Sequence, residues 1–116
     1  EHLEAFLANP AQLLAVAVSD GTVIGMASGV VHGHPDKPVQ LFVAEVGTAD
    51  AFRRRGVAAA VIDALLRRGR ELGCREAWVA TEAGNAPARA VYRAIGGVED
   101  PDPAVVYTFA LAADEA

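Results

Sequence analysis

One strand–helix–strand unit constrains the fold of this 116-residue chain more than any other feature of its sequence. The apolar stretch Val39–Val46 predicts a strand, and Ala77–Thr81 predicts another. Between them, residues 57–72 place apolar side chains near one face of a helix, and Gly73 is typical of the position just after a helix end. Such crossovers join parallel strands and are almost always right-handed. The unit therefore predicts an α/β fold.

The rest of the chain predicts a hairpin before this unit and a helix and a strand after it. Asp20-Gly21 is a strong two-residue hairpin signal, because both residues tolerate positive φ. Asn85 is suited to cap the second helix, and Pro87 is tolerated in its first turn. The predicted segments are a helix end at Glu1–Leu7 stopped by Asn9-Pro10, strands at Leu13–Val18 and Val23–Val31, a helix from Asn85 to Gly96-Gly97, and a strand at Val105–Leu111.

Length and cysteine content limit the class of protein. A chain of 116 residues supports one domain with one core, so we expect residues 1–116 to form a single domain. The chain starts at Glu1 without Met, and we expect an N-terminal strand or helix to precede it. The single cysteine, Cys74, excludes an internal disulfide framework and is expected to be a small buried side chain. Neither a membrane-length apolar run nor a secretory leader is present, so we expect a cytoplasmic protein.

The charges are unevenly distributed along the sequence. Nine arginines and four acidic residues lie between Arg53 and Arg93, whereas the rest of the chain holds one lysine and eleven acidic residues. This pattern indicates an anionic ligand on one side of the protein and a cationic one on the other. Arg67, Arg68 and Arg70 also fit a solvated helix face. The net charge of −5 and the lack of interleaved aromatic residues argue against nucleic-acid binding.

The turn that leads into the first long helix is the most informative segment. A helix N-terminus offers unpaired backbone N–H groups and a partial positive charge, and the arginines from Arg53 to Arg55 add to that charge. Gly56, with Ala58 and Ala59, leaves space for a ligand to approach the backbone. The segment lacks the Gly-Lys-Ser/Thr of a P-loop and the Gly-x-Gly-x-x-Gly of dinucleotide-binding folds. It therefore predicts a different kind of pyrophosphate cradle.

Three segments resemble motifs of the GNAT superfamily of N-acetyltransferases. Arg53–Ala58 is similar to the family's Gln/Arg-x-x-Gly-x-Gly/Ala motif, and Leu41–Thr48 resembles its bulged fourth strand. Asn85–Gly97 resembles its Asn-x-x-Ala-x-x-x-Tyr-x-x-x-Gly-Phe signature, although Gly97 stands where Phe is usual. A second, weaker resemblance, around Val43–Ala59, is to aminoglycoside 3-N-acetyltransferases.

The resemblance implies a fold and a cofactor site. The fold would be a mixed, mostly antiparallel twisted sheet with a central splayed parallel strand pair, flanked by helices. Acetyl-CoA would be the acetyl donor, its pantetheine arm pairing with Val46, Gly47 and Thr48 after a bulge that suits Gly47. Asn85 would touch the same arm or only cap its helix. The pyrophosphate would lie on the backbone N–H groups of Arg53, Arg54, Arg55, Gly56, Val57, Ala58 and Ala59.

The resemblance also implies two catalytic side chains. Tyr92 matches the family's general acid, and a phenol with a pKa near 10 is able to protonate a departing thiolate. The alternative is that Tyr92 is a core aromatic residue packed on Ala88. Glu45 lies where the family often has a carboxylate, and it would accept the amine's proton through water if it faces the site. Side chains alternate between the two faces of a strand, and the sequence does not decide on which face Glu45 lies. The alternative is that Glu45 is a solvated strand residue.

The activity implied is transfer of an acetyl group to a primary amine of a small cationic acceptor, by direct attack in a ternary complex. Polyamines, aminoglycosides and lysine-containing peptides all fit that description. The alternatives are a non-catalytic acyl-CoA-binding module and an enzyme that acetylates protein or peptide amines. His32 and His34 form too small a ligand set for a metal site and are expected to line the acceptor site with Asp36. Exposed apolar residues at Val105–Leu111 would permit a homodimer through that edge.

Overall fold

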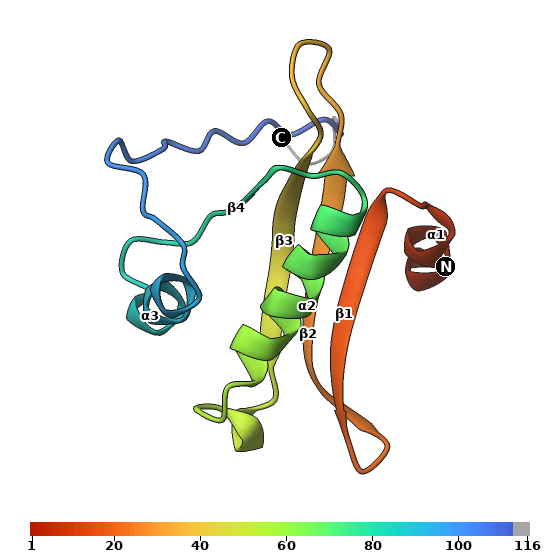
Figure 1. The fold of residues 1–116 in the computed structure, drawn as a ribbon, viewed down its shortest axis with the longest axis vertical. Helices are drawn as coiled ribbons and strands as arrows, with labels where there is room; N and C mark the ends of the chain where they lie inside the picture. The colour runs from red at the N-terminus through yellow and green to blue at the C-terminus, as the bar shows by residue number, and fades with distance from the viewer. Residues whose placement is uncertain (113–116) are drawn as a thin grey trace.

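The computed structural model describes residues 1–112 and contains one four-stranded mixed sheet (Figure 1). The sheet order is β1-β2-β3-β4, in which the first three strands are antiparallel neighbours and β3 and β4 are parallel. The elements are α1 (His2–Ala8), β1 (Gln12–Ser19), β2 (Thr22–His32), β3 (Gln40–Thr48), the short 3₁₀ helix η1 (Asp50–Phe52), α2 (Val57–Glu71), β4 (Glu76–Val79) and α3 (Ala86–Ala94).

The predicted hairpin and crossover are both present. Asp20 and Gly21 have φ values of 49° and 76°, as a two-residue turn between β1 and β2 requires. The strand–helix–strand unit is formed by β3, α2 and β4, and its two strands are parallel as predicted. The first helix ends at Asn9, whose side chain accepts a hydrogen bond from the Ala11 N–H at 3.0 Å.

Helix α2 covers one face of the sheet and encloses the core with it (Figure 1). Gly25 and Gly29 of β2 allow the close approach of the two layers. A Cβ atom at Gly25 would collide with Val57 of α2, and one at Gly29 would lie 3.2 Å from the Leu65 side chain of α2. The buried hydrophobic residues are Ala27, Leu41, Val43, Val61, Ile62, Leu65 and Cys74. The prediction that Cys74 is buried is therefore confirmed, and burial raises the pKa of its thiol.

A β-bulge lies in β3, but not at the predicted residue. Ser28 of β2 is paired with Glu45, whereas the next residue, Gly29, is paired with Val43. Ala44 is therefore the extra residue, and the prediction of a bulge at Gly47 is wrong. Gly47 keeps a regular partner in Met26. The suitability of glycine for a bulge did not indicate at which residue the pairing of β2 with β3 would shift.

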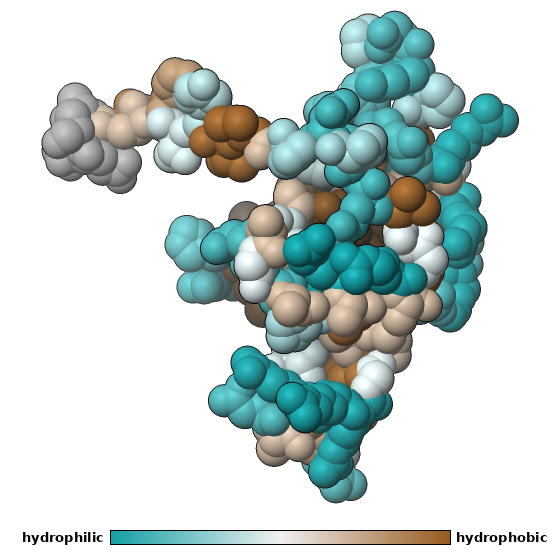
Figure 2. Space-filling model, turned by 90° about the vertical axis from the view of Figure 1, so that its left-hand side faces the viewer, coloured by the Kyte–Doolittle hydropathy of each residue, from teal (hydrophilic) through white to brown (hydrophobic). Residues whose placement is uncertain are grey.

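The predicted strand at Val105–Leu111 is not formed. Residues 103–111 have no regular secondary structure, and their side chains are exposed (Figure 2). Alternating apolar residues give a segment strand propensity, but a strand also needs a neighbouring backbone, and this segment runs away from β4. The parallel pair consequently lies at one edge of the sheet rather than at its centre. Strand β4 also ends at Val79, two residues before its predicted end.

No helix among residues 1–112 combines the length and the hydropathy needed to cross a bilayer.

Candidate functional site

The candidate site lies where the parallel strands β3 and β4 part. The two strands pair from Gln40↔Glu76 to Val43↔Val79, and β4 then ends. Residues 44–48 of β3 continue without a β4 partner, and we call this stretch the open edge of β3. A backbone edge of this kind can bond an extended ligand as if it were a further strand. The predicted pantetheine-binding residues Val46, Gly47 and Thr48 all lie on it.

The N-terminus of α2 is uncapped by the protein. Gly56 precedes the helix with a left-handed φ of 78°, no side chain caps the helix, and its first turn holds no acidic residue. Within residues 1–112, the first backbone hydrogen bond at this end of the helix runs from the Ala60 N–H to the Gly56 carbonyl at 3.0 Å. The N–H groups of Val57, Ala58 and Ala59 are thus available to an anion.

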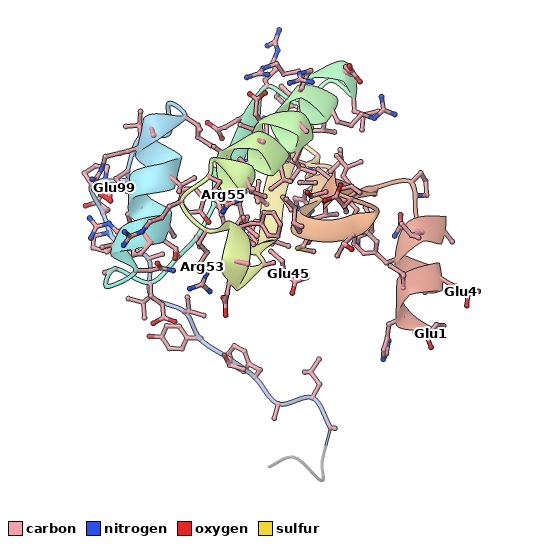
Figure 3. The ribbon with its side chains drawn as sticks, turned by 90° about the horizontal axis from the view of Figure 1, so that it is seen from below. Glu1, Glu4, Glu45, Arg53, Arg55 and Glu99 are labelled. Atoms are coloured by element: carbon pink, nitrogen blue, oxygen red, sulfur yellow. The ribbon has the colours of Figure 1, made fainter. Side chains whose placement is uncertain are left out.

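The three arginines before α2 form a compact positive loop. The Arg53 guanidinium lies 3.0 Å from the Asp50 carboxylate, and the Arg55 guanidinium lies over the Phe52 ring at 5.3 Å from its centre. Arg54 has a positive φ of 64°, which turns the backbone toward Gly56. The side chains of Arg53 and Arg55 are thereby held close to η1, at the same end of the sheet as Glu45 (Figure 3). The loop adds positive charge beside the uncapped helix.

The bulge at Ala44 decides which face of the sheet Glu45 occupies. Leu41 and Val43 are buried under α2 before the bulge, whereas Val46 packs against the core after it. The extra residue therefore shifts the alternation by one position and leaves Glu45 on the face away from α2, where it is exposed. Glu45 belongs to the open edge of β3, and its role as a base stays a prediction.

The Asn85 side chain makes two contacts within the protein. Its Oδ1 accepts a hydrogen bond from the Ala88 N–H at 3.2 Å, so Asn85 caps α3 as predicted. Its Nδ2 donates to the Thr81 hydroxyl at 3.2 Å. The amide nitrogen has a second hydrogen, so capping leaves a donor with which to contact a ligand. Asn85 thus anchors the loop between β4 and α3.

Tyr92 lies on α3 and packs partly against the core. Burial raises the pKa of its phenol above the ordinary value of 10, so the hydroxyl is protonated at neutral pH. The Gly97 N–H donates to the Tyr92 carbonyl at 2.9 Å, and a Cβ atom at Gly97 would lie 2.9 Å from that same oxygen. Any side chain at residue 97 would therefore require the backbone after α3 to shift.

An arginine–glutamate cluster on α3 went unpredicted. Arg89 donates to both oxygens of Glu99, from Nε at 2.7 Å and from Nη2 at 3.0 Å, and Arg93 donates to Glu99 at 3.0 Å. Arg89 and Arg93 are four residues apart, so the sequence indicated that they share one helix face. Glu99 lies ten residues after Arg89, beyond the helix, and no spacing rule identified it as their partner. Glu99 is thus neutralised and does not supply free negative charge for a cationic acceptor.

The histidine loop lies at the other end of the sheet from the open edge. His32 ends β2, and residues 33–39 connect it to the amino end of β3 (Figure 1). His34 Nε2 lies 3.0 Å from the Gln40 Oε1, and Gln40 Nε2 donates to Glu76 at 2.6 Å. The loop therefore lies away from the open edge of β3, and the expectation that these histidines line the acceptor site with Asp36 stays a prediction. Across residues 1–112, no cluster of three or more His, Cys, Asp or Glu side chains is arranged to hold a metal ion.

The Glu99 cluster predicts a pH dependence of stability. Hydrogen bonds from Arg89 above all, joined by Arg93, lower the pKa of Glu99 from 4.5 to about 2. As the pH falls, Glu99 therefore takes up a proton in the unfolded chain before it does so in the folded protein. The stabilisation by the Glu99 cluster is complete above about pH 4.5 and should be lost as the pH falls toward 2. We expect the stability difference between the protein and Glu99→Gln, measured by urea unfolding, to shrink over that range. A difference that stays constant with pH would contradict this assignment.

Three comparisons with known proteins identify relatives of this chain. Residues 1–96 match the model of the Acetyltransferase (GNAT) family. Aminoglycoside N(6′)-acetyltransferase type 1 of Salmonella typhimurium is 33% identical, with 79% of this chain aligned, and the chain spans 66% of that relative's length. The solved structure of AAC(6′)-Iy in complex with a bisubstrate analogue, CoA-S-monomethyl-acetylneamine, superposes with a TM-score of 0.81 at 29% identity, covering 92% of this chain and 75% of that one.

A more distant structure supports the fold alone. The aminoglycoside acetyltransferase meta-AAC0020, from an uncultured soil metagenomic sample, has a TM-score of 0.85 at 19% identity, covering 94% of this chain and 73% of that one. The predicted fold class, a mixed sheet with a splayed parallel pair, is confirmed. The aminoglycoside resemblance also holds, although the two closely matching relatives carry the 6′ position in their names rather than the 3 position. On this evidence, the chain belongs to the acetyltransferase (GNAT) family.

Proposed function

We propose that this chain transfers an acetyl group from acetyl-CoA to a primary amine of a small cationic acceptor. The observation that carries the proposal is the uncapped N-terminus of α2 beside the open edge of β3. The first feature suits a diphosphate and the second suits an extended amide-containing arm, and acetyl-CoA has both. The complexes with CoA and with a CoA bisubstrate analogue described for the AAC(6′)-Iy structures support this choice of donor.

In the proposed complex, the diphosphate accepts hydrogen bonds from the N–H groups of Val57, Ala58 and Ala59. The open conformation at Gly56 keeps side-chain atoms away from the phosphates. The pantetheine amides bond to the backbone of Val46 and Thr48, which lacks a partner on the β4 side. The positive loop from Arg53 to Arg55 contributes long-range attraction for the phosphates.

The chemical step joins the amine nitrogen of the acceptor to the thioester carbonyl carbon. As the carbon–sulfur bond breaks, the electron pair leaves with the CoA sulfur, and the Tyr92 hydroxyl donates a proton to it. The amine attacks in its neutral form, and its nitrogen, which becomes positively charged as the carbon–nitrogen bond forms, loses a proton to water held by Glu45, which is exposed on the face away from α2. Tyr92 regains its proton from solvent after CoA leaves. The raised pKa of Tyr92 keeps that proton in place until the thiolate forms.

The acceptor we propose is an aminoglycoside. The named activity of the Salmonella relative supports this class, and the charge of the chain, −5 overall, favours a polycationic amine. The experiment is a thiol-release assay with acetyl-CoA and a panel of amines: an aminoglycoside, a polyamine and a lysine-containing peptide. We expect CoA release with the aminoglycoside first. Release with the peptide alone would favour a protein acetyltransferase, and CoA binding without release would favour a non-catalytic module.

We also propose that the C-terminal arm, residues 104–112, pairs with the free edge of β4 in a second copy of this chain. Val105, Tyr107 and Phe109 are between 78% and 79% exposed, and Leu111 is 94% exposed. Figure 2 shows the arm standing clear of the body with apolar residues along it. Strand β4 bonds only to β3 among residues 1–112, so its outer edge offers the backbone partner that the arm lacks.

The homodimer predicts a change in mass when the arm is made polar. Replacing Tyr107 and Phe109 by Asp should convert a dimer to a monomer in sedimentation equilibrium, because two charges cannot be buried against β4. Replacing Asp100 and Asp102 by Asn, in the exposed turn before the arm, is the matched control and should leave the mass unchanged. A wild-type protein that sediments as a monomer at high concentration would rule out the pairing.

A further inference from the structure

Arg89 connects three segments of the chain through one guanidinium group. Its Nε and Nη2 donate to the two oxygens of Glu99, and its Nη1 donates to the Ala83 carbonyl at 2.7 Å. Ala83 belongs to the loop between β4 and α3, Arg89 to α3, and Glu99 to the segment that follows α3. The group therefore joins the chain on both sides of α3 to the helix itself.

The loop that Arg89 holds borders the open edge of β3. It follows directly after β4, at the point where the parallel strands part. Within this loop the Asn85 amide donates to Thr81, so residues 81–85 are tied down at two places, by Asn85 to Thr81 and by Arg89 to Ala83. A loop fixed in this way presents a constant wall to a ligand lying along the open edge.

The same contacts fix the orientation of α3. Arg89 and Arg93 are one turn apart and both donate to Glu99, which limits rotation of the helix about its axis. Tyr92 lies between them in the sequence, and its carbonyl accepts the Gly97 N–H. The direction in which the Tyr92 phenol leaves the helix thus depends on the Glu99 contacts.

This cluster differs from the other ion pairs of the protein. Arg67 and Asp63 on α2 share one bond of 2.7 Å, expose 65% and 59% of their side chains and connect no separate segments. Arg89 makes a two-bond fork with Glu99, and 37% of its side chain is exposed. Forked arginine–carboxylate pairs add geometric definition that single surface pairs lack.

We propose that Arg89 is a positioning residue for the acetyl-CoA site: by holding Ala83 and Glu99 together it fixes loop 81–85 and α3 as one wall beside the open edge of β3. This inference rests on the proposed function. It predicts that breaking the cluster weakens CoA binding while the buried centre of the core stays packed, because the fully buried residues lie in β2, β3, α2 and the loop after α2.

The sign of the effect at Glu99 separates positioning from simple charge attraction. If Arg89 acted only by its charge on the phosphates, removing the Glu99 carboxylate would strengthen CoA binding. If it acts by positioning, Glu99→Gln weakens CoA binding, although the variant has one negative charge fewer. Arg89→Lys should weaken binding as well, because a lysine keeps the charge but cannot form the fork and reach Ala83 together.

The experiment measures CoA affinity by calorimetry and Tm by circular dichroism for six chains: the wild type, Arg89→Gln, Arg89→Lys, Glu99→Gln, the double variant of Arg89→Gln with Glu99→Gln, and Arg67→Gln. We expect Arg89→Gln to weaken CoA binding about tenfold, Glu99→Gln to weaken it about fivefold, and the double variant to match Arg89→Gln, because the two groups act as one unit. Arg67→Gln is the matched control and should bind as the wild type does. The Tm of the Arg89 and Glu99 variants should fall together by the stability of the cluster, and the titrations are run well below every Tm, where all the chains are folded.

Three results would overturn the inference. They are unchanged CoA affinity in Arg89→Gln, tighter binding in Glu99→Gln, and wild-type affinity in Arg89→Lys. A wild-type protein that fails to bind CoA would instead refute the proposed function itself, so the two failures are distinguishable. If Arg89→Gln does not fold, Arg89→Lys and Glu99→Gln still carry the test.

Discussion

Replacing Gly56 by Glu should weaken CoA binding about 100-fold or more. The new carboxylate would lie at the start of α2, where the proposed diphosphate contacts the N–H groups of Val57 to Ala59. Repulsion between it and the phosphates, together with competition for the same amides, accounts for an effect of about 2.7 kcal/mol. The measurement is isothermal titration with CoA at low salt, where the effect is largest.

Gly56→Gln is the control that separates charge from backbone strain. Gly56 has a φ of 78°, so any other residue is strained there, while a Cβ atom itself meets nothing within 4 Å. Both variants carry the same strain and nearly the same volume. We expect Gln to cost much less affinity than Glu, and equal losses would show that the backbone conformation, not the anion site, is what matters at this residue.

Replacing Tyr92 by Phe should lower kcat about 100-fold and leave CoA affinity nearly unchanged. The hydroxyl is the only group removed, and its proposed task, protonation of the departing thiolate, arises in the transition state. Because burial raises its pKa, the phenol should remain an acid up to at least pH 10, so the wild-type rate should not fall with its ionisation below that pH.

The second tyrosine of the chain supplies the matched control. Tyr107 is 79% exposed on the C-terminal arm, so Tyr107→Phe removes the same hydroxyl at a distant position. Steady-state rates with the best amine of the panel, alongside CoA titrations, give the comparison. If Tyr92→Phe lost affinity and turnover to the same extent, Tyr92 would be a packing residue of α3 rather than the acid.

The sequence predicted those parts of the fold that depend on local pattern. The Asp20-Gly21 turn needs only two residues with positive φ, and α2 needs only apolar residues at helical spacing, so both were predictable. Asn85 was predictable as a cap for the same reason, since its bond to Ala88 spans three residues. The start of α2 at Val57, directly after Gly56, was predictable because its apolar spacing begins there.

Features that depend on distant partners were not predictable. The slip at Ala44 is set by which β2 residues α2 covers, and nothing local distinguishes Ala44 from Gly47 as the extra residue. Residues 105–111 have the composition of a strand, but only the path of the chain after α3 decides whether they reach β4. The contact of Arg89 with Glu99 joins residues ten apart across a turn, and the sequence gives no periodicity for such a pair.

The unpaired Ala44 decides on which face every later residue of β3 lies. If β3 paired through Ala44 without a slip, Val46 would turn outward to water and the Glu45 carboxylate would point under α2, toward the buried core. Deleting Ala44 would instead keep both faces, because Val43, Glu45 and Val46 would then alternate in an unbroken strand. A relative that is one residue shorter here can therefore carry the same chemistry at the following positions, whereas one of equal length needs the same slip to do so.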